Sequence, residues 1–247
     1  MILSLKKNEN FFTINDEVFY DLTLGIYKKN NVNCYYLNNP EFEYFESTEF
    51  IGNIKKGGSV NCEKISYYPH ASGTHTECAL HIADVDFTML EIDIPLLQLC
   101  LLISISPLQN ESDFIIDKSV INHIENKELA TAILIRTIPN FNSKVNMNYS
   151  NTNPPFFTID ALFYLKSLGF KHLLTDLPSI DKESDGGLLV AHKAWFLTDG
   201  IAQKDRTITE FIFVDNQIKD NLFLLNIQTP KIETDAVSSK VIIYPLI

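Results

Sequence analysis

The 247-residue sequence has no long apolar run, no closely paired cysteines and few basic residues. Its longest apolar stretch, residues 95–105, contains Gln98 and Ser104 and is too short to cross a bilayer. The first residues, MILSLKKNENFF, lack the apolar run and small-residue cleavage site of a signal peptide. These absences predict a cytoplasmic protein with no membrane partner.

Basic residues are outnumbered, with 20 Lys and Arg against 31 Asp and Glu, for a net charge of −11. Nucleic acids and anionic membranes require clustered cations, because their binding depends on releasing counterions. The charge balance therefore excludes nucleic acid as a partner. It identifies no other partner, since many enzymes carry this balance simply to stay dispersed.

The four cysteines, Cys34, Cys62, Cys78 and Cys100, form no C-x-x-C pair, so neither a zinc ribbon nor a thioredoxin-like motif is indicated. We expect free thiols, as in a reducing compartment. Cys78 adjoins Glu77, and we interpret it as a small buried thiol rather than a nucleophile. The sequence also lacks the G-x-S-x-G motif of a serine hydrolase.

No internal repeat or flexible linker divides the chain, so we expect a single domain over residues 1–247. A strand is expected around residues 17–22, followed by an irregular stretch over 28–45. Residues 96–106 and 130–137 are apolar and rich in branched side chains, as in strands that are buried on both faces. A helix is expected between them, over residues 118–128.

The chain then continues as a helix and a strand, a pattern that builds parallel sheet. Thr158 begins the expected helix and Gly169 ends it. Further strands are predicted at residues 170–176, 207–214, 221–227 and 240–246. The predicted fold class is α/β, a single domain with mixed β-sheets and flanking helices.

Three of the six histidines, His70, His75 and His81, fall within twelve residues. Chance would produce such a cluster in about one sequence in ten of this composition, so the clustering alone decides nothing. Glu77 adds a carboxylate on the same side of an extended chain as His75, and Gly73 allows a tight backbone path. Mixed histidine and carboxylate ligands suit Zn²⁺, Mn²⁺ or Fe²⁺ better than Ca²⁺ or Mg²⁺. A hydrogen-bonded loop without metal is the alternative that these residues leave open.

A second polar pair, His192 and Glu210, stands in an otherwise apolar-aromatic segment. Burying an ionised Glu210 would cost on the order of several kcal/mol unless it is paired or bound to metal. The spacing alone therefore places Glu210 on the solvent face of its strand. Trp195 and Phe196 could wall a pocket for a flat substrate, but core packing is the favoured interpretation.

Two further histidines, His123 and His172, have no such context, and we expect them at the surface or at the edge of the core.

The segment SGTHTECALH at residues 72–81 resembles the signature H-x-G-T/A-H-x-D-x-P-x-H of the cyclase family, which includes bacterial kynurenine formamidase, isatin hydrolase and certain polyketide cyclases. The matching positions are Gly73, Thr74, His75, Glu77 and His81. Glu77 replaces Asp and Ala79 replaces Pro. Ala71 stands where the family has its first histidine, so His70 requires a loop that is one residue longer.

Shorter similarities follow in family order, at residues 21–23 (DLT), 134–137 (LIRT), 176–181 (DLPSID) and 235–240 (DAVSSK), the last without the family's Pro and Arg. His192 and Glu210 resemble the family's downstream ligand pair. Their separation exceeds the family spacing, which predicts a lengthened loop near the site, around residues 199–206.

The resemblance implies a swivelling β/β/α fold and a binuclear Zn²⁺ or Mn²⁺ centre with no organic cofactor. His70, His75 and Glu77 would bind one ion, and Glu77, His192 and Glu210 the other. Glu77 would bridge the two ions and His81 would be the general acid and base.

The implied activity is hydrolysis of an amide, a cyclic amide or a lactone, so the expected partner is a small-molecule substrate. The best single named activity is that of an arylformamidase, which acts on N-formylkynurenine in tryptophan catabolism. A homo-oligomer, such as a homodimer, is also expected from the family. The departures at Glu77, Ala79 and His70 leave open a metal-binding or ligand-binding member without catalysis. A lyase or cyclase is a third alternative.

Overall fold

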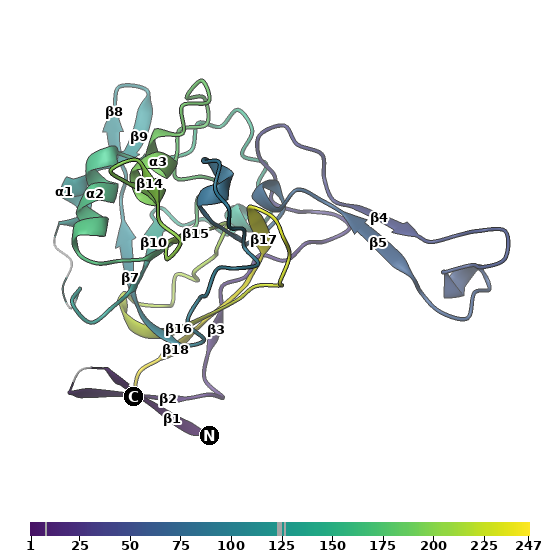
Figure 1. Ribbon diagram of the computed structural model, residues 1–247, viewed down its shortest axis with the longest axis horizontal. Helices are drawn as coiled ribbons and strands as arrows, with labels where there is room; N and C mark the ends of the chain where they lie inside the picture. Colours follow the sequence, from purple (N-terminus) through teal and green to yellow (C-terminus); the bar gives the residue numbers. More distant parts are fainter. Residues whose placement is uncertain (8, 123–124, 126) are drawn as a thin grey trace.

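The computed structural model describes residues 1–7, 9–122, 125 and 127–247, and its centre is a nine-stranded mixed sheet (Figure 1). In spatial order the strands are β17 (Ala236–Ser238), β6 (His75–Glu77), β15 (Thr207–Glu210), β12 (His172–Thr175), β10 (Ala132–Thr137), β7 (Gln98–Ile105), β16 (Asn221–Gln228), β18 (Lys240–Pro245) and β3 (Tyr20–Asp21). The four strands from β15 to β7 are parallel, and the others join antiparallel. The predicted α/β class is confirmed.

Both faces of the central strands are buried, which explains why their sequences are apolar throughout. Ile133 and Ile135 of β10 belong to the core that includes α2 (Ile159–Ser167) and α3 (Val190–Phe196). Leu134 faces the other way, into a core that contains Leu174 of β12 and Leu225 of β16.

The helix α2 begins and ends where the sequence predicts. The hydroxyl of Thr158 accepts a hydrogen bond from the backbone N–H of Ala161, a side-chain cap of the first turn. Gly169 follows the last turn with a φ of 90°, a conformation that favours glycine.

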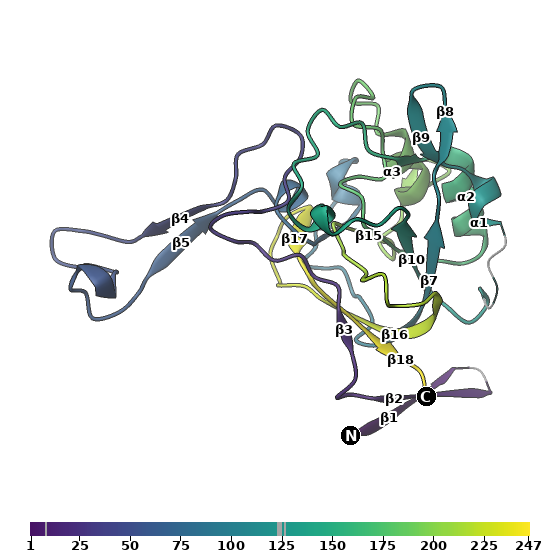
Figure 2. The same cartoon turned by 180° about the vertical axis from the view of Figure 1, so that it is seen from behind.

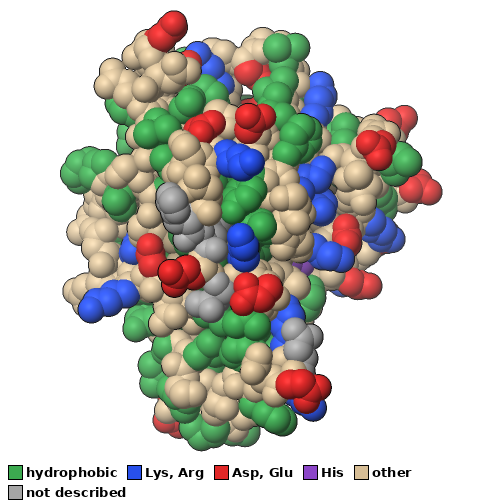
Figure 3. All heavy atoms as spheres, turned by 90° about the vertical axis from the view of Figure 1, so that its left-hand side faces the viewer, with side chains coloured by type: hydrophobic (Ala, Val, Ile, Leu, Met, Phe, Trp, Pro, Cys, Tyr) green, Lys and Arg blue, Asp and Glu red, His purple; other side chains and the backbone are tan. Residues whose placement is uncertain are grey.

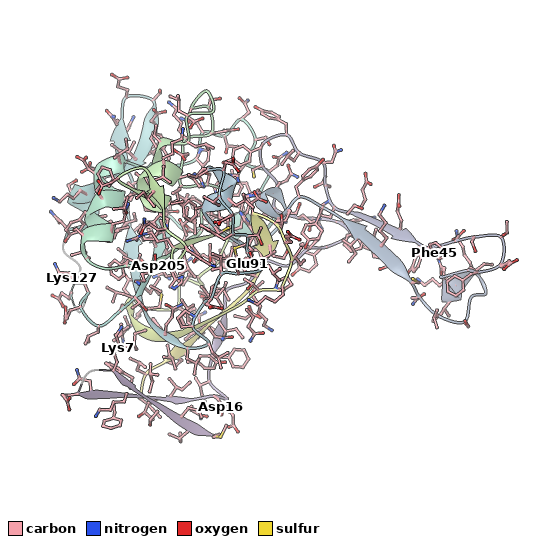
Figure 4. All side chains as sticks on the ribbon, viewed as in Figure 1. Lys7, Asp16, Phe45, Glu91, Lys127 and Asp205 are labelled. Atoms are coloured by element: carbon pink, nitrogen blue, oxygen red, sulfur yellow. The ribbon has the colours of Figure 1, made fainter. Side chains whose placement is uncertain are left out.

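Small elements surround this sheet. Two of the hairpins outside it are β1 (Ile2–Lys7) with β2 (Asn10–Asn15), and β4 (Glu41–Tyr44) with β5 (Glu63–Ser66). The second projects far from the body, on the side opposite α1 (Lys118–Ile121) and α2 (Figures 1 and 2), and Phe45 is on this projection (Figure 4). The remaining elements are β8 (Leu108–Asn110), β9 (Asp113–Ile116), β11 (Phe156–Phe157), β13 (Leu197–Thr198), β14 (Ile201–Ala202), and the 3₁₀ helices Ile54–Lys56, Pro69–Ala71, Ala79–His81 and Asn142–Asn146.

Four expectations about these elements need correction. The strand expected over 17–22 is only β3, and the stretch 28–45 is not wholly irregular because it contains β4. The strand expected over 207–214 ends at Glu210, because Phe211 has a φ of 55° and donates its N–H to the carbonyl of Leu177. In the helix expected over 118–128, the described residues form α1 and no further helix, and residues 123, 124 and 126 lie outside the described part of the chain.

The surface that carries α1 and α2 has acidic and basic side chains interspersed among apolar ones (Figure 3). The described residues of this face therefore form no large patch of one charge sign. Among the described residues, no helix is long and apolar enough to cross a membrane.

Candidate metal centre

The short strand β6 carries the centre of the candidate site. His75 and Glu77 alternate along it with Thr76 between them, and both are completely buried. On the neighbouring strand β15, Glu210 stands directly opposite His75 in the antiparallel register. The sheet therefore brings one histidine and two carboxylates together in the interior, although Glu210 is distant in sequence.

Glu77 is surrounded by histidine rings. Its Oε1 lies 2.9 Å from Nε2 of His192, and its Oε2 lies 3.2 Å from Nδ1 of His70 and 3.9 Å from Nε2 of His81. The short helix Pro69–Ala71 brings His70 to this position, so the longer loop places its ring beside Glu77. All three rings converge on a single carboxylate.

Glu210 completes the group from the other side. Its Oε2 lies 3.3 Å from Nε2 of His75 and its Oε1 lies 3.9 Å from Nε2 of His192. The backbone N–H of Ile180 donates to Oε1 of Glu210 at 2.9 Å. Glu210 is 2% exposed, so the placement on the solvent face is wrong. The compensation for its burial comes from histidines on other elements.

Hydrogen bonds behind two of the rings fix their orientation. Nδ1 of His192 lies 2.6 Å from Oδ2 of Asp181, and Nδ1 of His75 lies 3.2 Å from the carbonyl oxygen of Gly73. In each ring, Nδ1 makes this contact and Nε2 is directed at the carboxylates. This pattern is common among histidines that bind metal.

The segment DLPSID supplies Asp181 and anchors it. Oγ of Ser179 accepts the N–H of Asp181, and Asp181 in turn accepts the N–H groups of Ala191 and His192 at the start of α3. Asp176, at the other end of the segment, accepts N–H and O–H groups of Thr137 at the end of β10. The motif thus positions His192.

Asp235, the first residue of DAVSSK, contacts the remaining rings. Its Oδ2 lies 2.9 Å from Nε2 of His70 and 3.1 Å from Nδ1 of His81. Sequence reasoning noted Asp181 and Asp235 within family-like segments but gave neither a role. Only the folded chain brings them to these histidines.

The close contacts around Glu77 do not have hydrogen-bond geometry. Within this cluster, four buried atoms have no hydrogen-bond partner among the described residues: Nε2 of His75, Nε2 of His192 and both carboxylate oxygens of Glu77. Buried polar atoms are rarely left without partners. Three described groups place their ligand atoms close enough to hold an ion, namely His70, His75 and Glu77, then Glu77, His81 and His192, and finally His70, His81 and Asp235. The donor set fits a transition metal.

The electrostatics of the cluster favour a cation. Burial would raise the pKa of Glu77, but His192, His70 and His81 hold that pKa well below its usual value. Burial likewise opposes a charged His192, yet Glu77, Asp181 and Glu210 raise its pKa well above 6.5. The carboxylates therefore favour a proton on His192, and a divalent cation can supply the same positive charge.

The other candidate residues have structural positions. Trp195 and Phe196 are fully buried in the core, as favoured, and the indole N–H of Trp195 donates to the carbonyl of Thr207. Cys78 is buried, and this burial raises its pKa to about 11, so it is a thiol rather than a nucleophile. All four cysteines are free.

The two histidines outside the cluster are His172 and His123. His172 is buried in β12 and its Nδ1 lies 2.8 Å from Oγ1 of Thr207, so of the two expected positions, the surface or the edge of the core, the surface is wrong. His123 lies outside the described residues. Residues 199–206, where a lengthened loop is expected, contain β14, which pairs with β13 just before this range.

Comparisons with known proteins agree with this architecture. A family model described as "Putative cyclase" matches residues 20–182. A predicted metal-dependent hydrolase from Bacillus stearothermophilus is 21% identical, with a TM-score of 0.64 over 92% of this chain and 97% of that one. Isatin hydrolase A from Labrenzia aggregata, bound to benzyl benzoate, is 16% identical, with a TM-score of 0.63 over 92% and 93%. A search of curated proteins found no match.

Proposed function

The chain belongs to the cyclase family, and we propose that it is a metal-dependent hydrolase whose centre is built on Glu77. The observation that carries the proposal is the set of four buried atoms without partners, from His75, Glu77 and His192. Solved structures of the same fold include proteins described as metal-dependent and isatin hydrolases, which supports this choice of reaction.

The proposed metal centre is binuclear, and its two ions are Zn²⁺ or Mn²⁺. His70, His75 and Glu77 would hold one ion, Glu77, His192 and Glu210 the other, and Glu77 would bridge them. When bound, such ions lower the pKa of water and polarise a substrate carbonyl. The long carboxylate side chain of Glu77 replaces the family's Asp, and its two oxygens already face different histidines.

His81 is the proposed proton carrier. Its ring is 24% exposed, whereas His75 and His192 are buried, so it lies toward the accessible side of the cluster. Hydrolysis breaks the bond between the carbonyl carbon and the departing nitrogen or oxygen. The hydroxyl group of water goes to the carbonyl carbon, and a proton goes to the departing atom. His81 would take a proton from water and return it to the leaving atom.

The proposed substrate is an aryl formamide, and N-formylkynurenine is the best single candidate. The test is to incubate purified protein with Zn²⁺ or Mn²⁺ and to measure hydrolysis of N-formylkynurenine, isatin and an aryl lactone before and after chelation. Turnover that disappears with the chelator is expected. Failure of the metal-loaded protein on the whole panel would overturn the hydrolase proposal, and retained metal would then favour a binding protein.

Three further expectations are proposals of the same kind. We propose a homodimer, which sedimentation at several concentrations tests, and a cytoplasmic location, which fractionation tests. We also propose that residues 1–247 form one domain, for which a single cooperative unfolding transition is expected.

A further inference from the structure

We propose that Asp235 is a positioning residue that fixes the ring tautomers of His70 and His81 together, an inference that rests on the proposed metal centre. One oxygen, Oδ2, forms hydrogen bonds to both rings, at 2.9 Å and 3.1 Å. The two rings are stacked, with centroids 4.1 Å apart. A single carboxylate atom thus joins the displaced first histidine to the proposed proton carrier.

The chemistry of the contacts determines the tautomers. An ionised carboxylate only accepts hydrogen bonds, so each ring nitrogen that contacts it must carry a hydrogen. In its neutral form His70 then has its hydrogen on Nε2, and its Nδ1 lone pair faces Oε2 of Glu77. Neutral His81 has its hydrogen on Nδ1, and its Nε2 faces Glu77. Both lone pairs are available on the side where the ions are proposed.

This arrangement makes His70 different from the other proposed ligands. His75 and His192 bond through Nδ1 to Gly73 and Asp181 and present Nε2 to the centre. His70 presents Nδ1 instead, the nitrogen nearer its own backbone. The reversed ring explains how a histidine one residue away from the family position reaches the same carboxylate.

Asp235 is itself held in place. Its second oxygen, Oδ1, accepts the hydroxyl of Thr234 at 3.0 Å, and its backbone carbonyl accepts the N–H of Cys78 at 3.1 Å. The strand β17, which begins at the next residue, pairs with Glu77 on β6. The carboxylate is therefore fixed relative to the cluster by the same strand that carries Glu77.

Asp235 could instead be a metal ligand, since its oxygen and the nitrogens of His70 and His81 lie close enough to hold an ion. The geometry separates the two roles. Both contacts of Asp235 are aligned hydrogen bonds, whereas both oxygens of Glu77 lack a hydrogen-bond partner among the described residues. The structure therefore assigns Asp235 to orientation and Glu77 to the ion.

The test combines nitrogen NMR of the histidine rings, Zn²⁺ affinity and steady-state kinetics. Wild-type protein loaded with Zn²⁺ should show His70 with its hydrogen on Nε2 and His81 with its hydrogen on Nδ1. In Asp235→Ala, the hydrogen of His81 should no longer be confined to Nδ1. The same variant should bind Zn²⁺ about 10- to 100-fold more weakly and have a lower kcat with little change in KM. Asp235→Asn should recover much of the loss, because its amide oxygen still accepts hydrogen bonds.

Glu233→Ala is the matched control, since Glu233 is exposed and two residues away. A wild-type His70 with its hydrogen on Nδ1 would overturn the proposal, even if Asp235→Ala does not fold. Loss of one whole ion in Asp235→Ala with an unchanged His81 tautomer would overturn it in favour of a ligand role. The NMR and Zn²⁺ measurements need no substrate, so a protein without hydrolytic activity would refute the proposed reaction alone.

Discussion

His192 and Asp181 form a hydrogen bond of 2.6 Å between Nδ1 and Oδ2 in the interior of the protein, directly behind the contact between His192 and Glu77. Carboxylates in this position orient a metal-binding histidine and increase its basicity. We expect Asp181→Asn to weaken Zn²⁺ binding about 10- to 100-fold. Isothermal titration calorimetry measures this, with Asp160→Asn on the surface of α2 as the control. Equal affinities in the two variants would refute an orienting role for Asp181.

His81 provides a separate test of the proton carrier. It stands outside the five proposed ligands, so His81→Ala should keep its bound metal. Its kcat should fall by about 10²- to 10⁴-fold, the usual contribution of a general acid or base. Elemental analysis and steady-state kinetics of the same sample test both statements. His172→Gln serves as the control histidine, and comparable kcat values for the two variants would exclude His81 as the proton carrier.

Gly73 is required by its backbone conformation and by its surroundings. Its φ is 100°, and an added Cβ would lie 2.6 Å from the carbonyl oxygen of Leu24. Gly169 has a similar φ of 90° but open space around it, so Gly169→Ala measures the conformational cost alone, about 1–2 kcal/mol. Gly73→Ala should lower the free energy of unfolding by clearly more than Gly169→Ala in urea titrations. Similar losses would mean that the backbone moves to avoid the clash.

His172 predicts a dependence of stability on pH. Burial lowers its pKa from 6.5 to about 4, so acidification protonates this residue in the unfolded chain before the folded one. The free energy of unfolding should therefore decrease as the pH falls from about 6.5 to about 4, by up to about 3 kcal/mol from this residue. His172→Gln should remove that part of the slope. Parallel pH profiles of wild type and variant would contradict the prediction.

The central strands β7 and β10 were predictable because each contains a run of consecutive apolar residues, which indicates burial on both faces. Ile133 to Ile135 are apolar on both faces, and the cap and stop of α2 are single residues, Thr158 and Gly169. The hairpin of β4 and β5 lies outside the core and has no such run. Its alternation of glutamate with Phe42 and Tyr44 is the only local signal.

The candidate site was only partly predictable for a different reason. The placement of His75 and Glu77 on one side of a strand follows from the twofold period of extended chain. The burial of Glu210 does not, because it depends on pairing with a strand more than 130 residues earlier. The contacts of Asp235 with His70 and His81 likewise span more than 150 residues and arise only when β17 joins β6.

The most direct test of the metal centre is an anomalous diffraction map of crystals grown with Zn²⁺ or Mn²⁺. We expect one anomalous peak among Glu77, His192 and Glu210 and a second among His70, His75 and Glu77. Crystals of protein that bind no transition metal at these residues, or that bind it only between His70, His81 and Asp235, would contradict it.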